Sequence, residues 1–275
     1  MTELEQSTAP PPVVPLRQRT NGFDAQLRVI HALFMRELLT RFGSSRIGYV
    51  WLVMEPLSLA LMISALHWVS GHDLPNGIPI FLFYTLGYLP FMLFRQTLSR
   101  GSNAINANIS LLFHRNIKLI DVLVARNLME SGVCTVAIAL VMLIATIFFE
   151  YPPYQPGLFV LGLVFYALLA HGLGMFFASI MTIWEPFEHI VHPFGYIMMP
   201  LSGTFFMLSQ MGSEQRDAIM WVPLVHVAEM CRYAQWGNKV EPYFDVMYVI
   251  WWILALNLLG MAGLRIARPL VKMTD

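Results

Sequence analysis

The chain has 275 residues, of which 57% are apolar and only 12% are charged, and its formal net charge is zero. A soluble domain carries about twice that charged fraction, so the composition excludes an ordinary soluble protein. We predict one all-α membrane domain with a short polar tail, and we expect no nucleic-acid partner. The two cysteines, Cys134 and Cys231, lie in contexts too unlike each other to predict a disulfide.

The N-terminal region divides into a tail and a helix. Residues 1–22 are polar and rich in proline and have no apolar core, which predicts a disordered cytoplasmic tail and not a signal peptide. Residues 23–43 have helical spacing, with an apolar stripe that starts at Leu27 and with Arg28 and Arg36 away from it. This pattern predicts an amphipathic interface helix in the membrane surface. The alternative is a solvent-facing helix, but a membrane span follows directly.

Residues 44–268 form the predicted transmembrane domain, and 269–275 a cytoplasmic C-terminus. A span requires about 20 mostly apolar residues. Six segments are candidates, at about 47–69, 79–99, 122–149, 157–182, 190–208 and 246–267. With both termini inside, 14 Lys and Arg residues fall on the inner side and 3 on the outer side, as the positive-inside rule requires. In the fourth span, Ala170, Gly174 and Ala178 repeat at every fourth residue, which favours close helix packing.

Two connections are more than links between spans. The inner segment 101–120 is moderately apolar and predicts a short helix that meets a partner, with a plain loop as the alternative. The outer segment 209–245 is too apolar for a free loop and too short for two spans, which suits re-entrant half-helices. Within it, His226, Glu229 and Arg232 share one face. A His-x-x-Glu pair can bind metal, but no third ligand is evident, and the spacing favours a Glu229–Arg232 ion pair with a hydrogen-bonded His226.

Motifs of catalysis and nucleotide binding are missing from the sequence. It has no Gly-x-x-x-x-Gly-Lys-Ser/Thr phosphate loop, no His-Glu-x-x-His and no Gly-x-Ser-x-Gly. We therefore expect no catalytic residues, no metal and no cofactor in this chain, which is most simply a transport subunit. Few ionisable groups lie well inside the spans, which argues against an ion-coupled transporter. Glu55, next to Pro56 in the first span, is expected to face a polar conduit or to pair with a basic residue.

The second span carries an aromatic stripe of Phe81, Tyr84, Tyr88 and Phe91 that ends near Arg95. Aromatic faces with hydroxyl groups stack on sugar rings, so the stripe is a candidate lining for a sugar-polymer path. The alternative is a set of aromatic residues that pack in the core or face lipid, and the spacing by itself favours that alternative.

Several motifs in register resemble one family. They are Arg36–Gly43, Arg46–Trp51, Glu55–Pro56, Phe113–Arg126 and Pro223–Arg232. Over about residues 24–268 the chain resembles the membrane subunits of type-2 ABC exporters for polysaccharides, in particular the capsular polysaccharide export permeases. One departure is Val222, where many relatives have Asn before the proline. The Glu-Pro step favours the capsule branch, because O-antigen relatives more often have Asn-Pro.

The resemblance implies a homodimer of six-span subunits in the bacterial inner membrane, each with an interface helix, a cytoplasmic coupling helix and periplasmic re-entrant helices. Two copies of a separate ATPase would dock on the cytoplasmic side and bind the ATP and Mg²⁺. A periplasmic co-polymerase-type adaptor and an outer-membrane channel would complete the system. The substrate would be a lipid-linked acidic polysaccharide. The alternatives are an exporter of O-antigen, another lipid-linked glycan or a drug, and a membrane-embedded glycosyltransferase, which the lack of a catalytic motif disfavours.

The resemblance, together with the aromatic stripe of the second span, gives candidate site residues. The substrate conduit would involve Tyr49, Trp51, Glu55, Tyr84, Tyr88, Phe91 and Arg95, with the basic residues Arg41 and Arg46 at its entrance. Contact with the ATPase would involve Asn106, Leu111, Phe113, His114 and Arg115. The periplasmic re-entrant region would contain His226, Glu229 and Arg232. The arginines at the entrance are candidate ligands for a lipid phosphate or acidic sugars, and ordinary positive-inside anchors are the alternative.

Overall fold

The computed structural model describes residues 22–42, 46–69, 74–112 and 117–271. Within these ranges the chain is helical and contains no strand, as the sequence predicts. The α-helices are α1 (Gly22–Phe42), α2 (Arg46–Val69), α3 (Ile80–Ser102), α4 (Ala104–Ala107), α5 (Ile109–Leu112), α6 (Leu119–Phe149), α7 (Pro156–Ile183), α8 (Glu188–Leu201), α9 (Ser213–Ile219), α10 (Pro223–Trp236) and α11 (Val246–Val271). Short 3-10 turns occupy Pro75–Gly77, Glu185–Phe187, Leu208–Gln210 and Gly237–Lys239.

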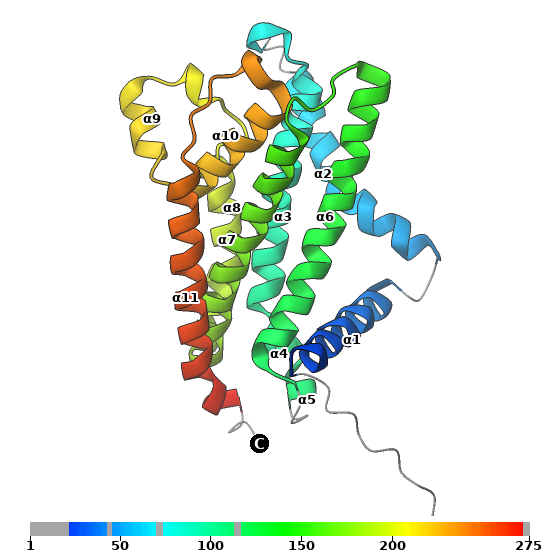
Figure 1. The fold of residues 1–275 in the computed structure, drawn as a ribbon, viewed down its shortest axis with the longest axis vertical. Coiled ribbons are helices and arrows are strands. Elements are labelled where there is room, and N and C mark those ends of the chain that lie inside the picture. The colour runs from blue at the N-terminus through cyan, green and yellow to red at the C-terminus, as the bar shows by residue number, and fades with distance from the viewer. Residues whose placement is uncertain (1–21, 43–45, 70–73, 113–116, 272–275) are drawn as a thin grey trace, which may run out of the picture.

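The long helices α3, α6, α7 and α11 run side by side along the length of the molecule (Figure 1). Helix α7 is central, because it contacts α3, α6, α10 and α11. We call the end that carries α4, α5 and the last turn of α11 the basic end, and the opposite end, with α9 and α10, the α10 end (Figure 1). Lys118, Arg265 and Arg268 all lie near the basic end, on the first turn of α6 and the last turns of α11.

Helix α7 packs closely on two sides through small residues. A Cβ on Gly260 of α11 would lie 2.7 Å from the carbonyl oxygen of Gly172 on α7, and one on Gly172 would lie 2.8 Å from the backbone nitrogen of Asn257. Toward α3, Gly174 belongs to the predicted small-residue repeat, and a Cβ there would lie 3.7 Å from the carbonyl oxygen of Leu98. Small side chains therefore let the backbones of three helices approach one another.

Three helices, α6, α7 and α11, are long and apolar enough to cross a membrane. Helices α2, α3 and α8 lie in the other predicted spans. In the fifth predicted span, 190–208, the helix α8 stops at Leu201 after 14 residues, a length of about 21 Å. Beyond it Gly203 has a φ of +78°, a conformation that favours glycine. The backbone then leaves the helix.

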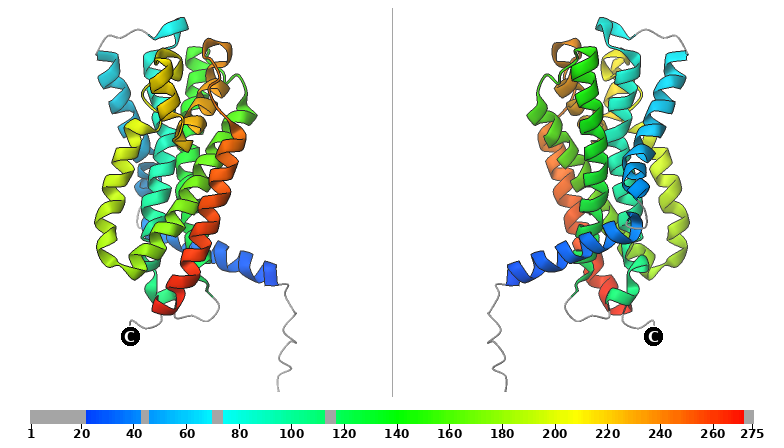
Figure 2. Two further views of the ribbon diagram at one scale, coloured as in Figure 1. Left: turned by 90° about the vertical axis from the view of Figure 1, so that its left-hand side faces the viewer. Right: turned by 90° about the vertical axis from the view of Figure 1, so that its right-hand side faces the viewer.

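Helix α1 lies across the basic end, at a steep angle to the long helices (Figure 2). Its bounds fall within one residue of the predicted interface helix. On one side, Leu33 packs against a small apolar cluster at the basic end. Exposed apolar side chains, Phe23, Leu27, Met35 and Leu39, occupy other positions along α1. Exposed apolar side chains on a helix at this angle suit insertion into the surface of a bilayer.

The predicted coupling segment differs from the expected single short helix. Helix α3 continues to Ser102, and two one-turn helices follow, α4 and α5. Asn108 separates them, and its side-chain amide donates a hydrogen bond of 3.0 Å to the carbonyl oxygen of Ala104. This local bond competes with the continuation of a helix, as asparagine side chains often do. Residues 113–116 lie outside the described part of the chain.

Candidate functional site

A polar cavity of about 500 Å³ lies near the basic end between α2, α3, α6 and α8. Binding sites for small molecules have volumes of about 300–1,000 Å³, so the cavity has the size of a ligand site. Its polar lining residues are Glu55, Arg95, Gln96, Ser99, Arg100, Asn103, Arg126, His192 and Tyr196. Three of these are arginines and one is a glutamate, so the side chains lining the cavity favour an anionic occupant.

Arg95 is the arginine of this cavity without a carboxylate partner among the described residues, and its side chain contacts Tyr88 and Tyr196. Its guanidinium carbon lies 4.9 Å from the centre of the Tyr196 ring on α8. A Cβ on Gly195 would lie 3.2 Å from the Arg95 side chain, so the glycine leaves room for it. Within the described residues, Arg95 forms no ion pair and its buried Nε has no hydrogen-bond partner. Its charge is therefore available to an anion in the cavity.

The other two arginines are paired with acidic residues. The Nε of Arg100 lies 3.1 Å from the carboxylate of Glu130 on α6, whose side chain is only 1% exposed. The Nε of Arg126 lies 3.4 Å from the carboxylate of Glu37 on α1. Because these two cations are already neutralised in part, Arg95 is the better candidate to bind a ligand.

Polar side chains continue along the interface between α3 and α6. The thiol of Cys134 donates to the side-chain oxygen of Gln96 at 3.4 Å, and the hydroxyls of Thr97 and Ser131 lie 3.3 Å apart. In hydrocarbon such groups require internal partners, since water is absent. The row of contacts therefore holds the two helices in register beside the cavity, which Gln96 also lines.

Helix α1 is tied to the bundle beside this cavity. Besides the Glu37–Arg126 pair, the guanidinium of Arg36 donates to the Asn108 side chain at 3.0 Å, between α4 and α5. The amide of Gln26 donates to the Asp121 carboxylate at 2.8 Å, at the start of α6. Helix α1 thus contacts both the predicted coupling segment and the helix that supplies Arg126 to the cavity.

The predicted conduit residues lie in different environments in the structure. Glu55 and Arg95 line the same cavity, whereas Trp51 is 65% exposed and does not line it. Tyr88 and Phe91 are 3% and 0% exposed within the bundle. Both side chains are therefore packed within the bundle, as the packing alternative describes, and their place along a conduit stays a prediction.

The remaining predicted residues of the conduit and coupling region are spread over several environments. Tyr84 is half-buried and stacks on His67, with ring centres 3.8 Å apart. Asn106 is exposed on α4, and Leu111 is half-buried on α5. The side chains of Arg41, Arg46 and Tyr49, together with Phe113, His114 and Arg115, lie outside the described part of the structure.

At the α10 end, the ion pair favoured by the sequence spacing is present. Arg232 and Glu229 are in direct contact, and their side chains are 5% and 2% exposed. Arg232 also donates to the carbonyl oxygen of Gly203 at 2.6 Å, and Glu229 accepts from the backbone N–H of Leu208 at 3.3 Å. Burial raises the pKa of Glu229, and the Arg232 guanidinium opposes that rise. The pair therefore fixes α10 to the chain that follows α8.

His226 has partners different from those of the ion pair. Its Nε2 lies 2.8 Å from the carbonyl oxygen of Met220, and its Nδ1 accepts from the backbone N–H of Asp245 at 2.9 Å. An acceptor at Nδ1 and a donor at Nε2 define the neutral tautomer with its proton on Nε2. In the described residues no group of three potential metal ligands occurs. His226 therefore fastens the two ends of the 220–245 segment.

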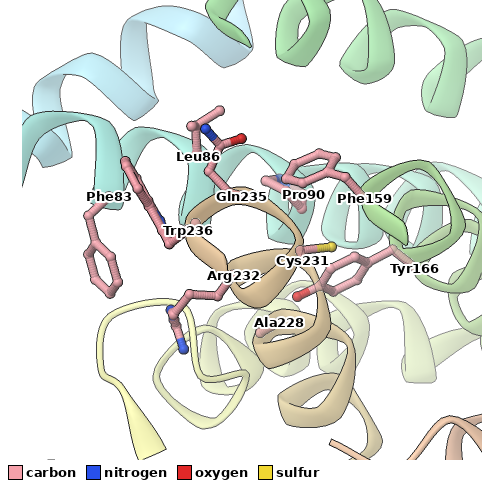
Figure 3. A pocket seen from close by; sticks show the side chains of 11 residues that line it. Phe83, Leu86, Pro90, Phe159, Tyr166, Ala228, Cys231, Arg232, Gln235 and Trp236 are labelled. Atoms are coloured by element: carbon pink, nitrogen blue, oxygen red, sulfur yellow. The ribbon is translucent and has the colours of Figure 1, made fainter. Parts of the chain in front are cut away.

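A second cavity beside Arg232 is too small for a sugar. It measures about 20 Å³ and lies between α3, α7 and α10, which is room for about one water molecule. Figure 3 shows Tyr166 and Cys231 side by side on one side of it, while Arg232 extends away from them. Burial raises the pKa of the Cys231 thiol to about 12. The contacts of the α10 residues therefore indicate a structural role.

Sequence reasoning missed several residues of the larger cavity and its surroundings. Arg100, Arg126, His192 and Tyr196 line it, and Glu37 reaches it through Arg126. Each had a weak signal, namely a charged or polar group near the predicted end of a span. Their convergence depends on how α1 and α8 pack, which helical spacing does not reveal.

With this geometry in place, comparison with known proteins identifies the family. Residues 28–236 match the ABC-2 type transporter family. The chain belongs to that family, and the resemblance drawn from its motifs is confirmed.

Its relatives include three proteins of capsule and polysialic acid export. The capsule polysaccharide export inner-membrane protein CtrC of Neisseria meningitidis serogroup A is 34% identical over 86% of this chain and 90% of its own. A capsule polysaccharide export inner-membrane protein BexB of Haemophilus influenzae is 31% identical over 87% of this chain and 91% of its own. A polysialic acid transport protein KpsM of Escherichia coli is 31% identical over 89% of this chain and 95% of its own.

Proposed function

We propose that this chain is the transmembrane subunit of an ATP-driven exporter that moves lipid-linked capsular polysaccharide across the inner membrane, from cytoplasm to periplasm. The observation that carries the proposal is similarity to capsule export proteins over nearly their whole length, at 34% identity for the CtrC relative. The cavity near the basic end supports it, because Arg95, which has no carboxylate partner among the described residues, offers a cation to an acidic sugar or a lipid phosphate.

The proposed topology has six spans and places both termini in the cytoplasm. Helices α2, α3, α6, α7, α8 and α11 would supply the spans, with α8 continued by the non-helical chain that Arg232 holds. The distribution of Lys and Arg supports a cytoplasmic position for the basic end. The polar cavity would then lie at the cytoplasmic entrance, and the α10 helix would be a periplasmic re-entrant helix.

The assembly is proposed to be a homodimer with two ATPase subunits beneath it, and with a periplasmic adaptor and an outer-membrane channel beyond it. ATP and Mg²⁺ would bind to the ATPase subunits. Helices α1, α4 and α5 meet at the basic end, through the Arg36–Asn108 hydrogen bond, and are the proposed docking site of the ATPase. The Glu37–Arg126 ion pair would link that docking site to the cavity.

Purification tests this division of labour. The chain isolated by itself should show no ATP hydrolysis, and when expressed from its own host it should co-purify with a nucleotide-binding protein. ATP turnover by the isolated chain would contradict the proposal. Formation of a glycan product from nucleotide sugars by the isolated chain would replace it with the glycosyltransferase alternative.

A further inference from the structure

A second groove at the basic end lies outside the polar cavity. It has a volume of about 300 Å³ and lies between the start of α6 and the last turns of α11. Helix α11 contributes Met261, Leu264, Arg265 and Arg268 to its lining. These residues are three to four positions apart and therefore lie on one face of the helix.

The rim of this groove is basic. Lys118 borders it from the α6 side, and Arg265 and Arg268 border it from α11. Both arginines are exposed, and within the described residues neither forms a hydrogen bond or an ion pair. Lys118 has one long contact, 3.5 Å from its Nζ to the side-chain oxygen of Gln26. None of the described lining residues is acidic.

The floor of the groove is apolar. Leu119 and Ile120 line it from α6, and Met261 and Leu264 line it from α11. Leu264 is 6% exposed and belongs to a packed cluster of buried apolar residues, so the floor is part of the core. Met261 is 39% exposed beside it. A groove with such a floor accepts a hydrocarbon chain, while its rim attracts an anion.

We infer that this groove binds an anionic phospholipid of the bilayer, with the headgroup phosphate between Lys118, Arg265 and Arg268 and an acyl chain along Met261 and Ile120. Basic grooves between membrane helices on the cytoplasmic side are typical sites for anionic headgroups. Helix α11 is apolar enough to span a membrane, and its last turns bring the arginines to the level where headgroups lie. The inference does not depend on the nature of the exported substrate.

Native mass spectrometry of the full chain in detergent tests this inference. The probes are phosphatidylglycerol, phosphatidylcholine with the same acyl chains, and glycerol phosphate. The wild-type chain should bind phosphatidylglycerol about tenfold or more tightly than phosphatidylcholine. Arg265→Gln/Arg268→Gln should reduce the affinity for phosphatidylglycerol by roughly 25-fold, since each basic residue near an anionic surface contributes about fivefold.

Two control variants make the result specific. Arg216→Gln/Lys239→Gln removes two positive charges at the α10 end and should leave phosphatidylglycerol binding unchanged. Arg265→Lys/Arg268→Lys should retain most of the binding and shows that the glutamine variant fails through lost charge. Each variant must elute as a monodisperse species, and if the double glutamine variant does not fold, the single variant Arg268→Gln, with an expected loss of about fivefold, carries the test.

Several outcomes would overturn the inference. Equal binding of the two phospholipids, or an unchanged preference in the glutamine variant, would show that the groove is not an anionic lipid site. Equal binding of glycerol phosphate and phosphatidylglycerol would show a site for free phosphate. Full lipid binding combined with loss of ATPase co-purification in the glutamine variant would assign the groove to a protein partner.

Discussion

Arg95 differs from the other two arginines of the polar cavity because it has no carboxylate partner among the described residues. Arg100 and Arg126 each have a carboxylate within 3.4 Å. Arg95 instead stacks on Tyr196 and has a buried Nε without a hydrogen-bond partner among the described residues. A partly buried cation without a counter-ion is costly unless something else neutralises it. A passing anionic group would do so, which gives Arg95 a physical reason to bind substrate.

Replacing Arg95 by Gln should therefore reduce capsule export about tenfold or more while the protein remains folded. The reason is the loss of a hydrogen bond to a charged group, which contributes about 1.5–3 kcal/mol. Surface polysaccharide on cells with equal amounts of each variant is the measurement. Arg28→Gln, on an exposed position of α1, removes a charge at the same end and should export normally. Normal export by the Arg95 variant would remove this residue from the mechanism.

The Glu229–Arg232 pair has a structural role in this account. Both side chains are almost completely buried, and both also bond to the backbone after α8. Glu229→Ala leaves the Arg232 charge buried without its partner, so we expect a loss of about 3–5 kcal/mol in the free energy of unfolding. The double variant Glu229→Leu/Arg232→Leu removes both charges and should cost less. Thermal unfolding in detergent measures the relative stability of the two variants. A double variant less stable than the single one would contradict this structural role.

At the scale of elements, α1 is the part of the chain that joins two regions with proposed functions. It contacts α4 and α5 through Arg36–Asn108, and α6 through Glu37–Arg126. Arg126 also lines the polar cavity. A movement of α1 relative to the bundle would therefore change the position of a cavity residue directly.

A double-mutant cycle on Glu37 and Arg126 tests this link. The pair is half-buried, so Glu37→Gln and Arg126→Gln should show a coupling energy of roughly 0.5–1 kcal/mol in thermal stability. Export should fall more in Arg126→Gln, because that change also removes a cation from the cavity. Additive effects of the two substitutions on stability would show that the ion pair does not hold α1 in place.

The positions of the helices can be predicted closely from the sequence, but the contacts between them cannot. Apolar runs of sufficient length define α6, α7 and α11, and helical spacing defines α1 to within one residue. The early end of α8 was not predicted, because it depends on the positive φ of Gly203 and on Arg232, 29 positions later in the chain. Likewise, Gly172 and Gly260 come into contact only when α7 and α11 pack.

The candidate site could be predicted only in part, because its residues also come together only through the packing of the helices. Glu55 and Arg95 stood out as charges inside or next to apolar spans, and the structure brings them to one cavity. The aromatic stripe did not decide between the two interpretations, because its helical spacing fits packing residues such as Phe91 as well as a lined path. Tyr196 and His192 were missed, since only the packing of α8 against α3 brings Tyr196 to Arg95 and both residues to the cavity.

At the scale of the whole molecule, the family of the chain and the proposed direction of transport fit one arrangement of its two ends. The chain is an ABC-2 type transporter, with a basic end that carries the polar cavity and an α10 end closed by buried polar contacts. Energy would enter at α1, α4 and α5, and the substrate would enter beside them. The sequence has no phosphate-binding loop, and we propose that a separate partner hydrolyses the ATP.

Reconstitution tests that central claim most directly. The chain and its cognate ATPase are placed in liposomes with fluorescent lipid-linked capsular polysaccharide, and the polymer that crosses the membrane is measured after ATP is added. The account predicts transport that requires both proteins and hydrolysable ATP. Transport at the same rate without ATP, or no transport of this polymer while ATP hydrolysis by the complex proceeds normally, would contradict it.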